Sequence, residues 1–312
     1  MIQLSHIYEV YMSIESQGLS LYEAAKQKGI PFTIPNKPDD RVISVRNMTF
    51  HYLEWGDPNR PTILMLHGNA QQAHSWDFIS LPLSEKFHVI ALDQRGHGDS
   101  DWSIDQDYST QEQVKDIDAI VSSLSLNQFH LVGHSMGGRN SYAWASENSD
   151  KLASLTIVDT GPDTESIGRR RMQQFKSLPD ELDSFEEFAD RIQSYTGRPM
   201  EQVLGSLKYN IRERQDGKWS WKYDKVMRHP EYQSQTIPSS MLWEMIKQIS
   251  CPTLIIRGNN SDVFNEDTME KMRNTIQDCT ITTVENAGHL VQGDNPVGFL
   301  REYRNFINHI IA

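Results

Sequence analysis

The sequence predicts an α/β fold: a doubly wound, mostly parallel sheet of eight strands. Six apolar runs are short, rich in Ile, Val and Leu, and do not alternate with polar residues, which is typical of strands buried on both faces. Helix-length mixtures of polar and apolar residues separate the runs, as βαβ units require. The six runs are Thr62–Leu66, His88–Leu92, Phe129–Val132, Leu155–Val158, Thr253–Ile256 and Thr280–Val284.

Two further strands complete the eight. They are expected at Val42–Val45 and Thr49–Trp55, and a turn cluster follows at residues 56–59. The helices expected between and after the strands cover residues 76–86, 110–124, 138–147, 265–275 and 296–311.

Residues 1–40 form an N-terminal arm outside this pattern. A short helix is expected in the arm, because Ser20 and Glu23 make a capping-box pattern and Gly29 with Pro31 provides a stop. We interpret the arm as a packing element, while a lid and a dimer arm stay open as alternatives.

The alternation of strands and helices is interrupted between residues 164 and 247, where helical patterns and aromatic clusters occur without a buried strand run. We therefore expect a helical cap, inserted after the sixth strand. The predicted organisation is an arm at 1–40, a core at 41–163 and 248–312, and a cap at 164–247.

Composition excludes several classes of protein. The chain of 312 residues is 38% apolar and 23% charged, which suits a globular domain with a sizeable core. A net charge of −12 disfavours nucleic acid as a partner. No run of 18 apolar residues and no continuous apolar segment of a secretory signal is found, so we expect no membrane insertion and a cytoplasmic location. Nothing in the sequence indicates the oligomeric state.

A nucleophile elbow joins the strand at 129–132 to the following helix. Its sequence is Gly133-His134-Ser135-Met136-Gly137. The turn is so tight that a Cβ atom at Gly133 or Gly137 would collide with neighbouring backbone. This geometry presents the Ser135 hydroxyl at the carboxyl end of the strand, near the positive end of the helix dipole.

A serine nucleophile needs a base and an acid that orients the base. His289 follows the last strand run on a glycine-containing loop, and Asp262 follows the preceding run, so both lie at the same sheet edge as Ser135. Asp262 is the predicted acid. Asp159, at the end of the run Leu155–Val158, and Asp294 are the alternatives.

Two backbone amides are expected to form an oxyanion hole. One is that of Met136, the residue after the nucleophile. The other is that of Asn69, in the loop after the strand Thr62–Leu66, where Gly68 permits close approach to a substrate. The side chain of Asn69 either serves the site or caps the following turn.

Taken together, these motifs resemble the α/β-hydrolase superfamily, in particular its esterase and lactonase-like branch with a helical cap. The resemblance covers about residues 40–312 and includes the loop Arg95–Ser100, which is structural in that family. It implies a triad of Ser135, Asp262 and His289 with an oxyanion hole at Asn69 and Met136. Related epoxide hydrolases and haloalkane dehalogenases carry aspartate where this chain has Ser135.

The predicted function is hydrolysis of a small-molecule carboxylic ester, lactone or thioester through an acyl-enzyme, with no cofactor and no metal. Two alternatives stay open: a carbon–carbon bond hydrolase of the meta-cleavage product type, and a hydrolase-fold ligand receptor with vestigial turnover. Trp76, Trp219 and Trp243 are candidate substrate contacts, with packing as the alternative for each. The run Arg169–Arg171 either attracts a carboxylate or is a solvated helix face.

Overall fold

A computed structural model describes residues 18–229 and 237–311 and confirms the predicted sheet. The eight strands lie in the order β1-β2-β4-β3-β5-β6-β10-β11. Strand β2 runs antiparallel to β1 and β4, and the other neighbours are parallel. Their bounds are β1 Asp39–Val45, β2 Met48–Trp55, β3 Thr62–Leu66, β4 His88–Leu92, β5 Phe129–His134, β6 Leu152–Val158, β10 Thr253–Gly258 and β11 Cys279–Val284.

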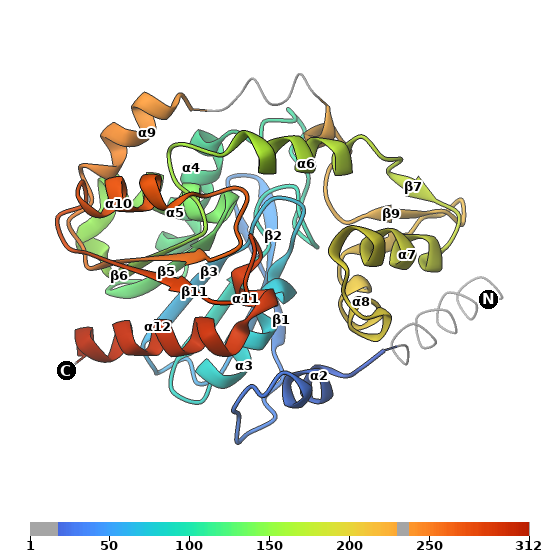
Figure 1. Ribbon diagram of the computed structural model, residues 1–312, viewed down its shortest axis with the longest axis horizontal. Coiled ribbons are helices and arrows are strands. Elements are labelled where there is room, and N and C mark those ends of the chain that lie inside the picture. The colour runs from blue at the N-terminus through green and yellow to red at the C-terminus, as the bar shows by residue number, and fades with distance from the viewer. Residues whose placement is uncertain (1–17, 230–236, 312) are drawn as a thin grey trace.

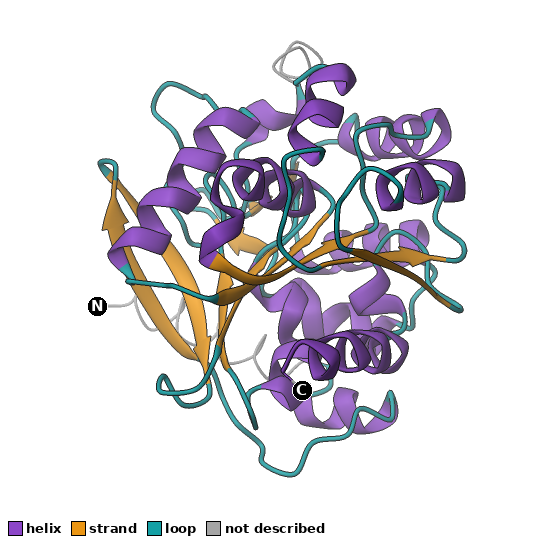
Figure 2. Cartoon of the chain, turned by 90° about the vertical axis from the view of Figure 1, so that its left-hand side faces the viewer, coloured by secondary structure: helices purple, strands orange, loops and turns teal. Residues whose placement is uncertain are grey.

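Helices cover both faces of the sheet (Figure 2). Within β3, Leu64 and Leu66 belong to the hydrophobic cluster on one face, and Ile63 and Met65 to the cluster on the other. Side chains of a strand point alternately to the two faces, so a strand covered on both sides needs an unbroken apolar run. One face carries α4 (Thr110–Ser123), α5 (Met136–Asn148), α9 (Ser239–Ile246) and α10 (Glu266–Arg273); the other carries α2 (Leu21–Gln27), α3 (Asp77–Leu83), α11 (Val291–Asp294) and α12 (Pro296–Ile311).

The cap follows β6, as predicted, but it is not purely helical. A small antiparallel sheet in the order β7-β9-β8 accompanies its helices. Phe188 and Trp221 meet edge to face at the centre of a separate hydrophobic cluster. The strands of the cap have two or three residues each, too few to show a strand pattern in the sequence. The cap elements are α6 Ser166–Lys176, β7 Glu181–Leu182, α7 Phe185–Thr196, α8 Met200–Leu207, β8 Ile211–Glu213, β9 Trp219–Trp221 and the 3-10 turn Lys225–Arg228.

Helix α9 belongs to the core, which corrects the predicted cap boundary at residue 247. Its buried residues Leu242, Trp243 and Ile246 join the hydrophobic cluster that α4 and α5 form on the sheet. In Figure 1, α9 accordingly lies above α5 and α10, on the opposite side of the molecule from α7 and α8. The sequence showed helical patterns within residues 164–247, but such a pattern does not tell on which neighbour a helix packs.

Strand β1 begins at Asp39, inside the predicted arm of residues 1–40, and the remaining described part of the arm, residues 18–38, contains the expected helix. Ser20 accepts from the amide of Glu23, and the Glu23 carboxylate accepts from the amide of Ser20, so both halves of the capping box are present. Ala25 packs into the core beside α3. Residues 1–17 of the predicted arm lie outside the described residues. Among the described helices, none is both long and apolar enough to cross a membrane.

Candidate active site

The strand–turn–helix around Ser135 has the geometry of a nucleophile elbow. Ser135 lies between β5 and α5 with φ 52° and ψ −112°, a backbone conformation that residues other than glycine rarely adopt. A Cβ atom on Gly133 would collide with the carbonyl oxygen of Gly137, and one on Gly137 with the carbonyl oxygen of Leu66. Both glycines are therefore required sterically, and the partly exposed Ser135 hydroxyl lies at the sheet edge.

A chain of hydrogen bonds runs from Ser135 through His289 to Asp159. Nε2 of His289 lies 3.0 Å from Oγ of Ser135, and Nδ1 lies 2.8 Å from Oδ2 of Asp159. Because the carboxylate only accepts, Nδ1 carries the hydrogen and Nε2 is the acceptor for the serine hydroxyl. The serine is thus aimed at a base whose tautomer is fixed by a buried acid.

The predicted acid, Asp262, does not contact His289; this prediction is corrected in favour of Asp159. The Asp262 carboxylate lies 3.5 Å from Arg171 of α6, and the Asp262 side chain is 30% exposed. The side chain of Asp159, in contrast, is fully buried. Both acids follow strands that end at the same sheet edge. The sequence rule that placed them there cannot distinguish them, and only the direction of each side chain does.

Asp159 has the better position because β6 lies between β5, which carries the nucleophile, and β10, which precedes Asp262. Its backbone has φ +51°, and its Oδ1 accepts from the amide of Gly258 at 2.9 Å. Gly258 must lack a Cβ, because one would collide with the carbonyl oxygen of Gly288 in the loop that carries His289. The ends of β6, β10 and β11 are therefore packed together behind the imidazole.

The loop of His289 is held from below by His134. Nε2 of His134 donates to the carbonyl oxygen of His289 at 2.7 Å, and the two rings lie 4.8 Å apart. Burial, together with the neighbouring His289, keeps the pKa of His134 well below its usual value, so the ring stays neutral. On the other side of the loop, Asp294 accepts from the amide of Gly288 at 3.0 Å.

The two expected oxyanion amides lie on segments that pack together. The amide of Gly137 donates to the carbonyl of His67 at 3.1 Å, which joins the start of α5 to the loop after β3. Within the described chain, the backbone amides of Asn69 and Met136 donate a hydrogen bond to no protein group. The Asn69 side chain does not cap the turn, since its Nδ2 contacts the sulfur of Met136 at 3.9 Å and its Oδ1 has no described partner.

A family model described as "alpha/beta hydrolase fold" matches residues 61–296, about three quarters of the chain. The chain belongs to this family. The matched segment includes every residue of the hydrogen-bonded chain from Ser135 to Asp159. The family confirms the fold that the sequence motifs predicted.

Several relatives of this hydrolase match along most of their length. Esterase Rv0045c of Mycobacterium tuberculosis is 27% identical over 92% of this chain and 94% of its own. N-formylmaleamate deformylase of Pseudomonas putida is 26% identical, with 86% and 96% covered. Among solved structures, that of E-2-(acetamidomethylene)succinate hydrolase superposes with a TM-score of 0.77 at 22% identity, covering 87% of this chain and 100% of its own. At this identity the structural likeness shows the fold alone.

The three tryptophans proposed as substrate contacts pack elsewhere in the hydrolase. Trp76 is fully buried in the cluster under the sheet, 6.0 Å from Phe299. Trp219 meets Phe185 edge to face within the cap cluster at 5.5 Å. Trp243 joins the core cluster through α9. Their aromatic character predicted an apolar pocket, but each ring is used to hold an element in place.

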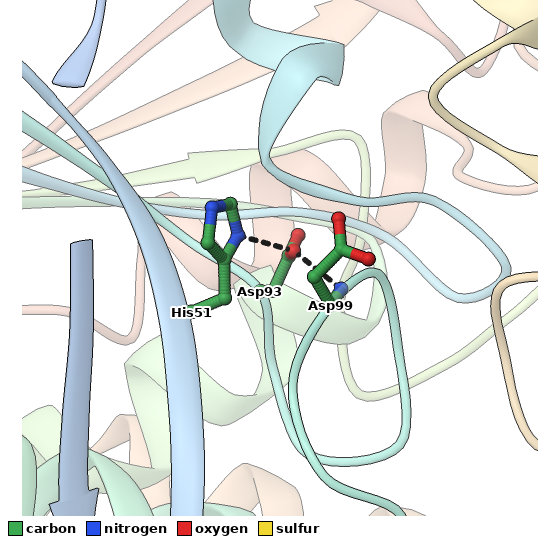
Figure 3. A group of neighbouring side chains, drawn as sticks. All are labelled: His51, Asp93 and Asp99. Atoms are coloured by element: carbon green, nitrogen blue, oxygen red, sulfur yellow. Dashed lines mark hydrogen bonds and ion pairs between the residues drawn. The ribbon is translucent and has the colours of Figure 1, made fainter. Parts of the chain in front are cut away.

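His51 of β2 and two acids of the loop after β4, Asp93 and Asp99, form a group with the spacing of a metal site (Figure 3). Nδ1 of His51 bonds to Asp93 at 2.8 Å and Nε2 to Asp40 at 3.0 Å. Asp93 also accepts amides on both oxygens, and Asp99 binds Lys222 of the cap at 2.8 Å.

Each of these groups already has a hydrogen-bond or ion-pair partner within the protein, so the cluster is a structural link between β2, β4 and the cap. Arg95, in the same loop, pairs with Asp116 of α4 through two hydrogen bonds of 2.6 and 2.8 Å. This agrees with the expected structural role of residues 95–100.

Proposed function

We propose that this protein is a serine hydrolase that cleaves a small carboxylic ester, lactone or thioester through an acyl-enzyme. The observation that carries the proposal is the hydrogen-bonded chain from Ser135 through His289 to the buried Asp159. It is supported by two amides, on Asn69 and Met136, that have no acceptor within the described protein. The names of relatives that are esterases and lipases agree with this chemistry.

In the proposed reaction, Ser135 Oγ forms a bond to the acyl carbon while its proton moves to Nε2 of His289. The negative charge on the carbonyl oxygen is bound by the amides of Asn69 and Met136. The bond to the leaving alcohol or thiol then breaks, and that group takes the proton from His289. Water, deprotonated by the same imidazole, attacks the acyl-enzyme and releases the acid and free Ser135.

Asp159 serves this cycle through the imidazole. It fixes the tautomer and stabilises the imidazolium that forms when the serine proton is taken. Because the Asp159 side chain is fully buried and Nδ1 lies 2.8 Å away, its charge is little screened by water. The site therefore contains the groups that acyl transfer needs without a metal ion or an organic cofactor.

The test is a panel of p-nitrophenyl esters, lactones and a thioester with the wild type and with Ser135→Ala. We expect ester turnover by the wild type and its loss in the variant, with unchanged thermal unfolding. An N-formyl amide and a meta-cleavage product belong in the same panel. A large preference for the vinylogous diketone would assign the triad to carbon–carbon cleavage, and failure of a fluorophosphonate to label folded wild type would refute the serine mechanism.

A further inference from the structure

Ser261 touches the acid of the triad. Its hydroxyl donates to Oδ2 of Asp159 at 2.5 Å, the same oxygen that accepts from His289. With the Gly258 amide on Oδ1, the carboxylate therefore accepts three hydrogen bonds, two from the end of β10 and its turn and one from the loop of His289. A hydroxyl bonded to a charged carboxylate is a strong, directional contact, so Ser261 limits rotation of the acid.

The Ser261 oxygen is itself held in a turn. It accepts from the amides of Val263 at 3.3 Å and Phe264 at 3.2 Å, so the single hydroxyl hydrogen is free to serve Asp159. The amide of Ser261 donates to the carbonyl oxygen of Gly258 at 3.0 Å. This turn, residues 261–264, thus begins on the β10 end that also supplies the other donor to Asp159.

The same turn carries the first helix of the cap. The amide of Gly168, in α6, donates to the carbonyl oxygen of Asp262 at 2.9 Å, and the amide of Glu165 donates to that of Val263 at 2.9 Å. A Cβ atom on Gly168 would lie 2.5 Å from Val263 Cγ2 and 2.6 Å from the Asp262 carbonyl oxygen, so α6 rests directly on the turn. In Figure 1, α6 runs across the top of the sheet towards β7 and the rest of the cap.

We infer that Ser261 is a positioning residue, which holds the Asp159 carboxylate towards His289 and ties its position to cap helix α6 through the turn 261–264. This inference rests on the proposed serine-hydrolase function. It assigns a purpose to a motif, Ser261-Asp262, whose aspartate does not contact the histidine.

The test measures labelling of Ser135 by a fluorophosphonate at increasing probe concentration, which separates the limiting rate from half-saturation. Loss of one hydrogen bond to a charged group predicts a limiting rate about 10- to 100-fold lower in Ser261→Ala, with half-saturation within about twofold. Ser261→Cys, which fills the same space with a weak donor, is expected to be slow as well. Ser261→Thr, which keeps the hydroxyl, is expected to restore most of the rate.

Asn265→Ala is the matched control. Asn265 caps α10 in the same loop, accepting from Thr268 at 2.7 Å, and its hydrogen bonds go to α10 and to Glu165 rather than to Asp159. It is expected to lower the unfolding temperature and to leave the limiting rate unchanged. A slowing in Asn265→Ala equal to that in Ser261→Ala would reduce Ser261 to a structural role and overturn the inference.

The link to the cap is tested by Gly168→Ala, alone and combined with Ser261→Ala. We expect Gly168→Ala by itself to slow labelling. Combined with Ser261→Ala, it is expected to slow labelling little further, because both substitutions act through one turn. If the two substitutions slow labelling additively, the proposed link between Asp159 and α6 is refuted. If the probe labels the wild type and labels Ser261→Ala at the same limiting rate, the positioning role alone is refuted. If the probe does not label the wild type, the proposed function and this role are refuted together.

Discussion

The acid of the triad offers the sharpest comparison, because two aspartates end neighbouring strands and only one contacts His289. We expect Asp159→Asn to remove nearly all ester turnover and Asp262→Asn to leave it almost unchanged. The two substitutions are chemically identical and conserve volume, so each serves as the control for the other. The sequence motifs alone favoured the opposite outcome.

The magnitude for Asp159→Asn follows from its contacts. Both carboxylate oxygens face donors, Gly258 on one side and Ser261 with His289 on the other. An amide placed there presents its NH₂ to one of these donors and carries no charge to stabilise the imidazolium. For a Ser-His-Asp triad this change costs about 10⁴-fold in kcat, or about 5 kcal/mol of barrier.

Asp262→Asn removes only an ion pair with Arg171, at 3.5 Å, in which the two side chains are 30% and 57% exposed. Exposed pairs contribute about 0.2–1 kcal/mol to stability. We therefore expect kcat within about twofold of the wild type and a small change in unfolding temperature.

The assay is initial-rate hydrolysis of the best p-nitrophenyl ester, with circular dichroism melts to confirm folding. Full activity of Asp159→Asn together with inactive, folded Asp262→Asn would refute the reasoning from geometry. Equal losses in both variants would mean that the α6 contact of Asp262 matters as much as the hydrogen bond to the imidazole.

Three further predictions concern the surroundings of the site. Gly68→Ala places a Cβ atom 2.7 Å from Nδ1 of His134, so the loop carrying Asn69 must move, and we expect kcat to fall about 10-fold or more in the ester assay; an unchanged kcat would argue against this loop as the oxyanion site. Burial alone lowers the pKa of His51, but its hydrogen bonds to Asp93 and Asp40 and the nearby charges of Asp93 and Asp99 outweigh burial and raise it. Protonated His51 therefore contributes its full stabilisation below pH ~6.5, and this contribution is lost as the pH rises through the raised pKa. In urea unfolding, His51→Gln should lower the free energy of unfolding more at pH 6 than at pH 9. An equal loss at both pH values would contradict this. Gly205→Leu puts a Cβ atom 3.0 Å from the carbonyl oxygen of Leu19, where the arm crosses α8. Because leucine is a good helix former, the substitution tests this contact and not the stability of α8. Faster tryptic cleavage at Lys26 or Lys28 would report a displaced arm, whereas unchanged cleavage would show that the crossing tolerates the side chain.

The arm illustrates what a local sequence pattern can and cannot predict. The Ser20 and Glu23 pair predicted the helix that the structure contains, because a capping box involves residues only three apart. The partners of the arm are distant in sequence: Ala25 packs on the core, and Gly18 crosses Gly205 of the cap. No local pattern encodes such contacts.

The tryptophans show the same division. Trp76, Trp219 and Trp243 are large apolar side chains that must be buried, and the sequence correctly indicates that each needs an apolar environment. Whether that environment is a pocket or a core depends on which face of each element is covered, and all three lie in packing clusters.

By itself, the sequence determined the sheet, the insertion point of the cap, the nucleophile elbow and the positions of Ser135 and His289. These depend on short-range patterns: unbroken apolar runs, glycines at a tight turn, and loops that follow strands at one sheet edge. Only the tertiary structure decided between Asp159 and Asp262, and assigned α9 to the core. The reason is physical, since chain order brings several acids to one edge, but a hydrogen bond needs a side chain that points at its partner within about 3 Å.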